Sequence, residues 1–137
     1  MARSKRQRIQ DARKRLALAR KQWDEAVTDS WEPAEPADCV TKSFYGFENA
    51  LMAAVVATGG PRTQRHYEKA DLALKLHEDH GLRDISDRLT ELNDLRKDVS
   101  YGEPGAELAG VNLDDLVSEL ESFIDEVDRL ITAQEKA

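Results

Sequence analysis

An arginine and a tyrosine near the end of one predicted helix are the side chains best suited to chemistry on a phosphate: Arg96 and Tyr101. They are five residues apart, which is about 140° around an ideal α-helix. A guanidinium can bind a phosphate through two parallel hydrogen bonds, and a phenol can stack on a base or donate a hydrogen bond. The alternative is a structural role, in which Arg96 pairs with Glu48 and Tyr101 plugs the end of a helical bundle.

Glu48 lies in the most apolar stretch of the chain, where a polar group needs a partner. It can orient Arg96 or act as a base, so the candidate catalytic residues are Arg96, Tyr101 and Glu48. The alternative is that Glu48 simply faces solvent. Lys97 directly follows Arg96, and both are candidate nucleic-acid contacts.

The charge of the chain is strongly asymmetric. The first 22 residues carry nine lysines and arginines against Asp11 alone, a local charge of +8. The net charge is −7, so the other 115 residues carry −15. A basic arm on an acidic body either binds nucleic acid or pairs with an acidic face of its own or a neighbouring protomer. We prefer the pairing, because the acidic body repels RNA beyond the arm. The candidate nucleic-acid contacts in the arm are Arg6, Arg8, Arg13 and Arg15.

The histidines and the single cysteine do not form a recognisable reactive site. His77 and His80 share one helical face, whereas His66 lies eleven residues before His77, about 16 Å along a helix. One ion cannot be shared over that distance, so we predict neither a metal nor a cofactor. Cys39 is the only cysteine and has no adjacent histidine, so neither an intramolecular disulfide nor a nucleophile triad is expected.

Apolar residues recur at spacings of three and four along most of the chain, which predicts an all-α fold. The first helix has a narrow apolar stripe and is expected to pack on a surface, whereas the second is the most apolar and is expected at the centre. Asn112 is the expected N-cap of the last helix. We divide the chain into a basic N-terminal helix, 1–30, and a bundle, 36–134. The pattern predicts an up-and-down bundle of about five helices, at 4–28, 37–58, 63–80, 84–102 and from 113 onward.

Composition places the chain among soluble proteins. Charged residues make up 34% and hydrophobic residues 40% of the sequence, which is ordinary for a folded helical domain. No apolar run approaches the roughly 20 residues of a membrane span, and no apolar core follows the basic N-terminus as in a secretion signal. We therefore expect a cytoplasmic protein without membrane contact.

Two local patterns resemble the HEPN family, prokaryotic helical bundles of toxin–antitoxin and defence systems. SFYGFENAL at 43–51 is similar to the aromatic, small-residue helix of that family's core. LRKDVSYG at 95–102 is similar to the helix that carries the family's motif, an arginine followed four to six residues later by a histidine. The resemblance covers residues 38–131. In the family's catalytic members, it implies a metal-independent endoribonuclease in which two protomers bring their motifs together in one cleft.

Arg96 matches the motif arginine, but residues 101–103, Tyr-Gly-Glu, stand where the resemblance leads us to expect the histidine. A phenol with an ordinary pKa of about 10 is a poor general base at neutral pH. The family is often paired with small nucleotidyltransferases, so the resemblance also implies such a partner protein and makes Tyr101 a candidate for nucleotidylation.

Three hypotheses for the function follow. The first is a non-catalytic HEPN-like interaction protein, homodimeric and associated with RNA, in a toxin–antitoxin or defence system. The second is a metal-independent endoribonuclease that uses Arg96, Tyr101 and Glu48. The third is a helical adaptor or regulator unrelated to RNA, whose basic first helix docks a partner.

Overall fold

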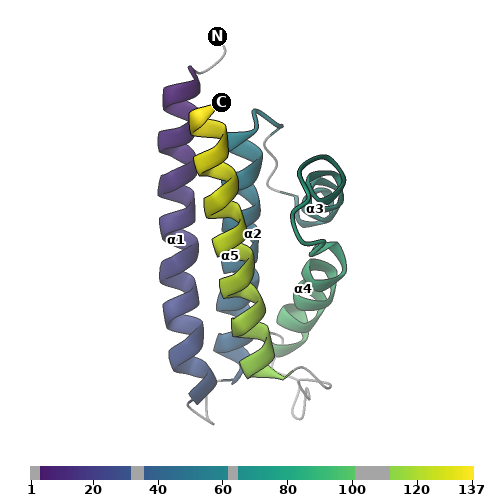
Figure 1. Ribbon diagram of the computed structural model, residues 1–137. Helices are drawn as coiled ribbons and strands as arrows, with labels where there is room; N and C mark the ends of the chain where they lie inside the picture. The colour runs from purple at the N-terminus through teal and green to yellow at the C-terminus, as the bar shows by residue number, and fades with distance from the viewer. Residues whose placement is uncertain (1–3, 32–35, 62–64, 101–111) are drawn as a thin grey trace.

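The computed structural model describes residues 4–31, 36–61, 65–100 and 112–137. These residues form five α-helices and no strand, which confirms the predicted all-α bundle (Figure 1). The first helix continues to Trp31, beyond its predicted end at Thr28. The helices are α1 (Lys5–Trp31), α2 (Pro36–Ala57), α3 (His66–His80), α4 (Ser86–Ser100) and α5 (Leu113–Lys136).

The three long helices α1, α2 and α5 run side by side, and the two short helices lie against α2 on the side away from α1 (Figure 1). The chain runs down α1 and back up α2, and α5 is parallel to α2. Helix α3 crosses α2 near its C-terminal end, and α4 returns along the bundle. Helix α2 packs against all four others, which confirms its predicted central place.

The core is built mainly on α2. Its two buried phenylalanines, Phe44 and Phe47, are at most 1% exposed, and the Phe47 ring lies 6.0 Å from the ring of Phe123 on α5. Gly46 allows the close approach of α5, because a Cβ there would lie 2.8 Å from Cδ2 of Leu120. Although α2 is the most apolar helix, no helix of the described residues is long and apolar enough to cross a membrane.

Helix α1 contributes to this same core, which corrects the expectation that it packs on a surface. Its stripe residues Ile9, Ala12, Leu16 and Ala19 are at most 5% exposed and join one buried cluster with residues of α2 and α5. The stripe is narrow because alanines make up half of these positions, and small side chains let two helices approach closely. Trp23 closes the far end, where its Nε1 donates a hydrogen bond to the carbonyl of Val117 at 2.9 Å.

The helix ends follow the expected local chemistry. Asn112 caps α5, and its side-chain oxygen accepts a hydrogen bond from the amide of Asp115 at 3.0 Å, as predicted. Gly81 ends α3 with a φ of +70°, a left-handed conformation that favours glycine. Asp84 begins the turn into α4, where its carboxylate accepts hydrogen bonds from the amide and hydroxyl of Ser86 at 2.9 and 2.6 Å.

Candidate functional site around Arg96

Arg96 lies on α4 beside two aromatic rings of α2. Its guanidinium carbon is 5.1 Å from the centre of the Phe44 ring and 5.8 Å from the centre of the Tyr45 ring. These rings meet edge to face, with centres 5.7 Å apart. Phe44 is buried in the core, whereas Tyr45 lies at its rim and is 37% exposed. A guanidinium within about 6 Å of a ring is attracted to the electron-rich face, so the two rings hold Arg96 in position.

A side chain of α4 itself fixes the guanidinium further. Nη2 of Arg96 donates a hydrogen bond to Oδ1 of Asn93, one helical turn earlier, at 2.8 Å. Nε is buried and has no hydrogen bond to a described residue. Nη1 also has none, and no carboxylate of the described residues forms an ion pair with this arginine. The cation is therefore held in place, half-buried, without a counter-charge from the described part of the chain.

Glu48 of α2 pairs with Lys69 of α3 and not with Arg96. Nζ of Lys69 is 3.3 Å from Oε2 of Glu48, and the two side chains are 12% and 7% exposed. The alternative that Glu48 faces solvent is therefore wrong, and so is the alternative that it forms the ion pair that anchors Arg96. Glu48 instead ties α3 to the central helix, close to the rings on which Arg96 rests.

The C-terminal part of the predicted motif is only partly described. Tyr101, the second candidate catalytic residue and the candidate modification site, lies outside the described residues. Lys97 is exposed, and its side chain forms no ion pair with a described residue. Two neighbouring cations, Arg96 and Lys97, thus lie near the C-terminal end of α4, one held against aromatic rings and one projecting into solvent.

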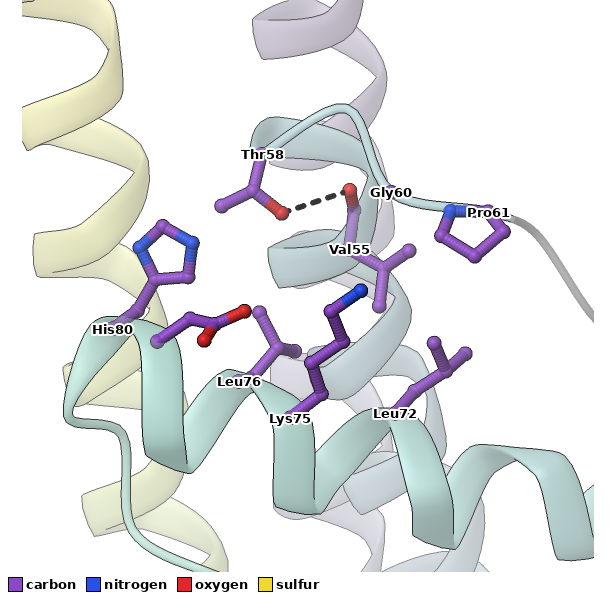
Figure 2. A pocket seen from close by; sticks show the side chains of 9 residues that line it. Val55, Thr58, Gly60, Pro61, Leu72, Lys75, Leu76 and His80 are labelled. Carbon is purple, nitrogen blue, oxygen red and sulfur yellow. Dashed lines mark hydrogen bonds between the residues drawn. The ribbon is translucent and has the colours of Figure 1, made fainter.

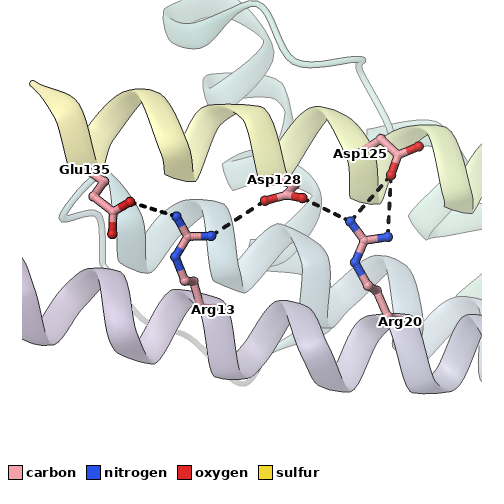
Figure 3. A network of polar contacts seen from close by, with 5 residues as sticks. All are labelled: Arg13, Arg20, Asp125, Asp128 and Glu135. Atoms are coloured by element: carbon pink, nitrogen blue, oxygen red, sulfur yellow. Dashed lines mark hydrogen bonds and ion pairs between the residues drawn. The ribbon is translucent and has the colours of Figure 1, made fainter.

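Two arginines of α1 form ion pairs with the acidic face of α5 (Figure 3). Arg13 lies 3.7 Å from Asp128 and 3.0 Å from Glu135. Arg20 lies 3.4 Å from Asp125 and 3.2 Å from Asp128. This is the pairing with an acidic face of its own chain that the charge asymmetry led us to prefer. Arg13, one of the predicted nucleic-acid contacts, is therefore already neutralised.

The other three arginines predicted to contact nucleic acid lie in different surroundings. Arg15 donates a hydrogen bond to Oδ1 of Asn49 on α2 at 3.3 Å. Arg8 is half-buried, and its Nε lies 4.0 Å from the place that a Cβ on Gly59 would take, just beyond the end of α2. Arg6 is exposed, and its side chain has neither an ion pair nor a hydrogen bond to a described residue. Among the four arginines of the N-terminal arm that were predicted to contact nucleic acid, Arg6 therefore has the charge least engaged by other described residues.

A cavity of about 150 Å³ lies between the end of α2 and α3, away from Arg96 (Figure 2). Val55 and Leu76 form part of its apolar wall, and its polar side chains are Thr58, Lys75, Asp79 and His80. A lysine in the same cavity as His80 and Asp79 disfavours a bound cation. Among the described residues, no group of three or more histidines, cysteines, aspartates or glutamates is placed to hold a metal ion.

Cys39 is buried, and its environment makes it unreactive. Burial, together with the nearby charges of Asp29 and Asp114, raises the pKa of the thiol to about 11, although the neighbouring Ser43 hydroxyl acts in the opposite direction. The thiolate is the nucleophilic form, so at neutral pH this cysteine has little capacity for covalent chemistry.

Comparison with known proteins identifies no relative of this chain. No family model matches the sequence, and no characterised protein and no solved structure is significantly similar to the chain. The resemblance to HEPN proteins therefore rests on the two sequence patterns at 43–51 and 95–102.

Sequence reasoning identified Arg96 but missed the residues that hold it in place. Phe44 and Tyr45 were predicted only as core residues, and neither Asn93 nor Lys69 was singled out. The spacing of three between Asn93 and Arg96 is a recognisable sign of contact on one helix face. The place of Lys69 depends on how α3 crosses α2, which apolar spacing does not reveal.

Proposed function

We propose that this protein is a non-catalytic, HEPN-like interaction protein that binds RNA, acting as a cytoplasmic homodimer in a toxin–antitoxin or defence system. The observation that carries the proposal is the state of the Arg96 guanidinium. It is fixed by two rings and one amide, and it has no ion-pair partner among the described residues. A planar guanidinium that is already oriented loses little conformational entropy when it binds a phosphate.

The surroundings of Arg96 suit an unpaired nucleotide. Nη1 is not engaged by any described residue, so it can donate to a phosphate oxygen. The partly exposed ring of Tyr45 lies beside the guanidinium and can stack on a base. Lys97 adds a second positive charge on the next residue of α4. Stacking requires a base that is not already paired, so single-stranded RNA is the expected ligand.

The proposal leaves catalysis out because proton transfer lacks a suitable group. Metal-independent cleavage needs a base to activate the ribose hydroxyl and an acid for the leaving oxygen. Glu48 is nearly buried and paired with Lys69, and the sequence places Tyr101 where the family has a histidine. An endoribonuclease that uses Arg96, Tyr101 and Glu48 is the alternative, and it requires Glu48 to leave its lysine. A small nucleotidyltransferase partner and modification of Tyr101 remain predictions of the resemblance.

Binding and cleavage can be measured on the same samples. Labelled single-stranded and hairpin RNAs are titrated with the protein in EDTA, binding is followed by fluorescence anisotropy, and the RNAs are then run on a denaturing gel. We expect binding of the single strand without cleavage. Arg96→Ala should weaken it about tenfold or more, the equivalent of about 1.4 kcal/mol. Arg96→Lys should recover part of the loss, because it keeps the charge but not the planar fork.

Arg129→Ala is the matched control, because Arg129 is exposed on α5 and forms no ion pair with a described residue. It should bind RNA like the wild type. Equal affinity of wild type and Arg96→Ala would reject the proposal. Cleavage by the wild type that Arg96→Ala lacks would establish the endoribonuclease instead.

A further inference from the structure

The outer face of α1 is a second basic surface, separate from the site on α4. Arg6, Gln10, Lys14, Ala17 and Lys21 all are exposed. On an ideal helix they fall within a sector of about 80°, opposite the buried stripe. Figure 1 shows α1 on the far side of α2 from α4, so this sector points away from the site around Arg96. We call these five residues the α1 outer face.

The cations of the α1 outer face have no partners in the described part of the chain. The side chains of Arg6, Lys14 and Lys21 form neither an ion pair nor a hydrogen bond with a described residue. Their neighbour Arg13, by contrast, is neutralised by α5. Asp24 is the next residue on the same side and ends the basic tract. The positive potential of α1 is therefore concentrated on its outer face.

A hollow adjoins the N-terminal end of this face. Lys5, Arg6, Ile9, Gln10, Arg13 and Glu135 line a cavity of about 340 Å³. The one carboxylate of this lining is bound by Arg13 at 3.0 Å, and Lys5 donates a hydrogen bond to the main-chain oxygen of Ala137. Arg6 is thus the free cation of the hollow, beside the amide of Gln10, and both groups can donate to an anionic oxygen.

We propose that the α1 outer face binds the sugar–phosphate backbone of the RNA, an inference that rests on the proposed function. From Arg6 to Lys21 the face is about 22 Å long, and Lys14 lies about 12 Å from one end and about 10 Å from the other along the axis. A stacked strand has a phosphate about every 3.4 Å, so the face spans about six phosphates and its three cations contact them at intervals. Such contacts position a strand without selecting its sequence.

The composition of the face favours a nucleic-acid backbone over an acidic protein. Protein interfaces have an apolar core, commonly with aromatic side chains. The only apolar member of the α1 outer face is Ala17, and the large exposed side chain of Leu18 lies outside the sector. Charged groups and an amide on one rigid line provide contacts to phosphates and almost no apolar area for a folded partner.

The test is the salt dependence of binding in a charge-matched pair of variants. The first variant is Arg6→Gln/Lys14→Gln/Lys21→Gln. The control is Lys75→Gln/Arg129→Gln/Lys136→Gln, which removes three exposed, unpaired cations elsewhere among the described residues. The probes are a 20-nucleotide single-stranded RNA and the DNA of the same sequence. Anisotropy gives Kd for each across a KCl series from 50 to 200 mM.

Loss of three phosphate contacts should reduce the magnitude of the slope of log K against log salt concentration by about 2. Between 50 and 200 mM KCl, the factor by which Kd rises should therefore be about 20 times smaller for the variant than for the wild type. The same reduction is expected with DNA, because phosphates alone are contacted, and the control should keep the wild-type slope. A wild-type slope in the first variant, or an equal reduction in the control, would overturn the inference.

Arg96→Ala in the same series separates this inference from the proposed function. An unchanged slope in the α1 variant together with weak binding by Arg96→Ala overturns only the α1 surface. A reduced slope in the α1 variant together with wild-type affinity of Arg96→Ala overturns the proposed role of Arg96 but not the proposed role of the α1 outer face. Polyglutamate, which mimics an acidic protein, is the last probe. If it binds the wild type but not the α1 variant, and does not change RNA binding by either protein, the occupant of the face is an acidic protein and the proposal is overturned.

Discussion

The ion pair between Lys69 and Glu48 should be a main attachment of α3 to the central helix, and Lys69→Met tests it. Both side chains are nearly buried, at 12% and 7% exposed, with Nζ and Oε2 3.3 Å apart. Removing one partner of a buried pair costs about 3–5 kcal/mol, because a charge is left in a poorly solvated place. Neither side chain is fully buried, so we expect the lower end, a loss of about 3 kcal/mol in the free energy of unfolding.

Urea unfolding followed by circular dichroism at 222 nm measures this loss. With a slope of about 1.5 kcal/mol per molar urea, the midpoint should fall by about 2 M. Glu48→Leu/Lys69→Met should lie within about 1 kcal/mol of the wild type, because an apolar pair replaces the charges.

Lys75→Met is the matched control on the same helix. Lys75 is exposed and forms no ion pair with a described residue, so its replacement should change the stability by no more than about 0.5 kcal/mol. The reasoning about the buried pair is refuted if Lys69→Met is as mild as Lys75→Met, or if the double variant is as unstable as Lys69→Met alone.

Three shorter predictions concern other parts of the fold. Leu120→Asp should abolish the cooperative unfolding transition, because it puts a carboxylate at a position with 0% exposure; a folded variant contradicts the core assignment. Hydrogen bonds from Ser86 hold the pKa of the Asp84 carboxyl below its ordinary value of 3.8. The stabilisation that these hydrogen bonds give the folded protein is therefore present above pH 3.8 and is lost as the pH falls through the lowered pKa. The stability difference from Asp84→Asn should therefore disappear in acid. Cys39 should react with a thiol reagent only in urea; rapid labelling of the folded protein contradicts its burial.

Most of the fold could be predicted because its helices carry strong local signals. The last helix has both a side-chain cap at Asn112 and an apolar stripe with buried Leu120 and Ile124, and the structure confirms each. The first helix shows the limit of such reasoning. Alanines contribute little to an apolar pattern, yet Ala12 and Ala19 are fully buried because their small size lets α1 approach its neighbours closely.

The candidate site was only partly predictable, because its contacts join helices distant in the sequence. The motif resemblance singled out Arg96, but a sequence pattern does not say whether a carboxylate or an aromatic ring will hold a guanidinium. Here Phe44 and Tyr45 hold it, and Glu48 is bound by Lys69 from a third helix. These outcomes depend on the crossing of α3 and α4 over α2, which helical periodicity leaves open.

The place of α1 in the core also changes how its basic residues must be tested. Truncating residues 1–22 would remove Ile9 and Leu16 from the buried cluster, so lost RNA binding in such a variant would report on folding. Substitution of exposed cations on α1 leaves the buried stripe intact. Charge variants therefore give the interpretable test of RNA binding by this helix.

The contact between Arg96 and RNA can be observed directly through the Nε–H resonance of this arginine. That resonance is assigned in ¹H–¹⁵N spectra as the signal missing from Arg96→Lys, and the wild type is then titrated with single-stranded RNA. We predict that the signal shifts and saturates with the same midpoint as the anisotropy titration, because a phosphate on the guanidinium changes its electronic surroundings. An Arg96 resonance that stays in place while the RNA becomes fully bound would contradict the proposed function.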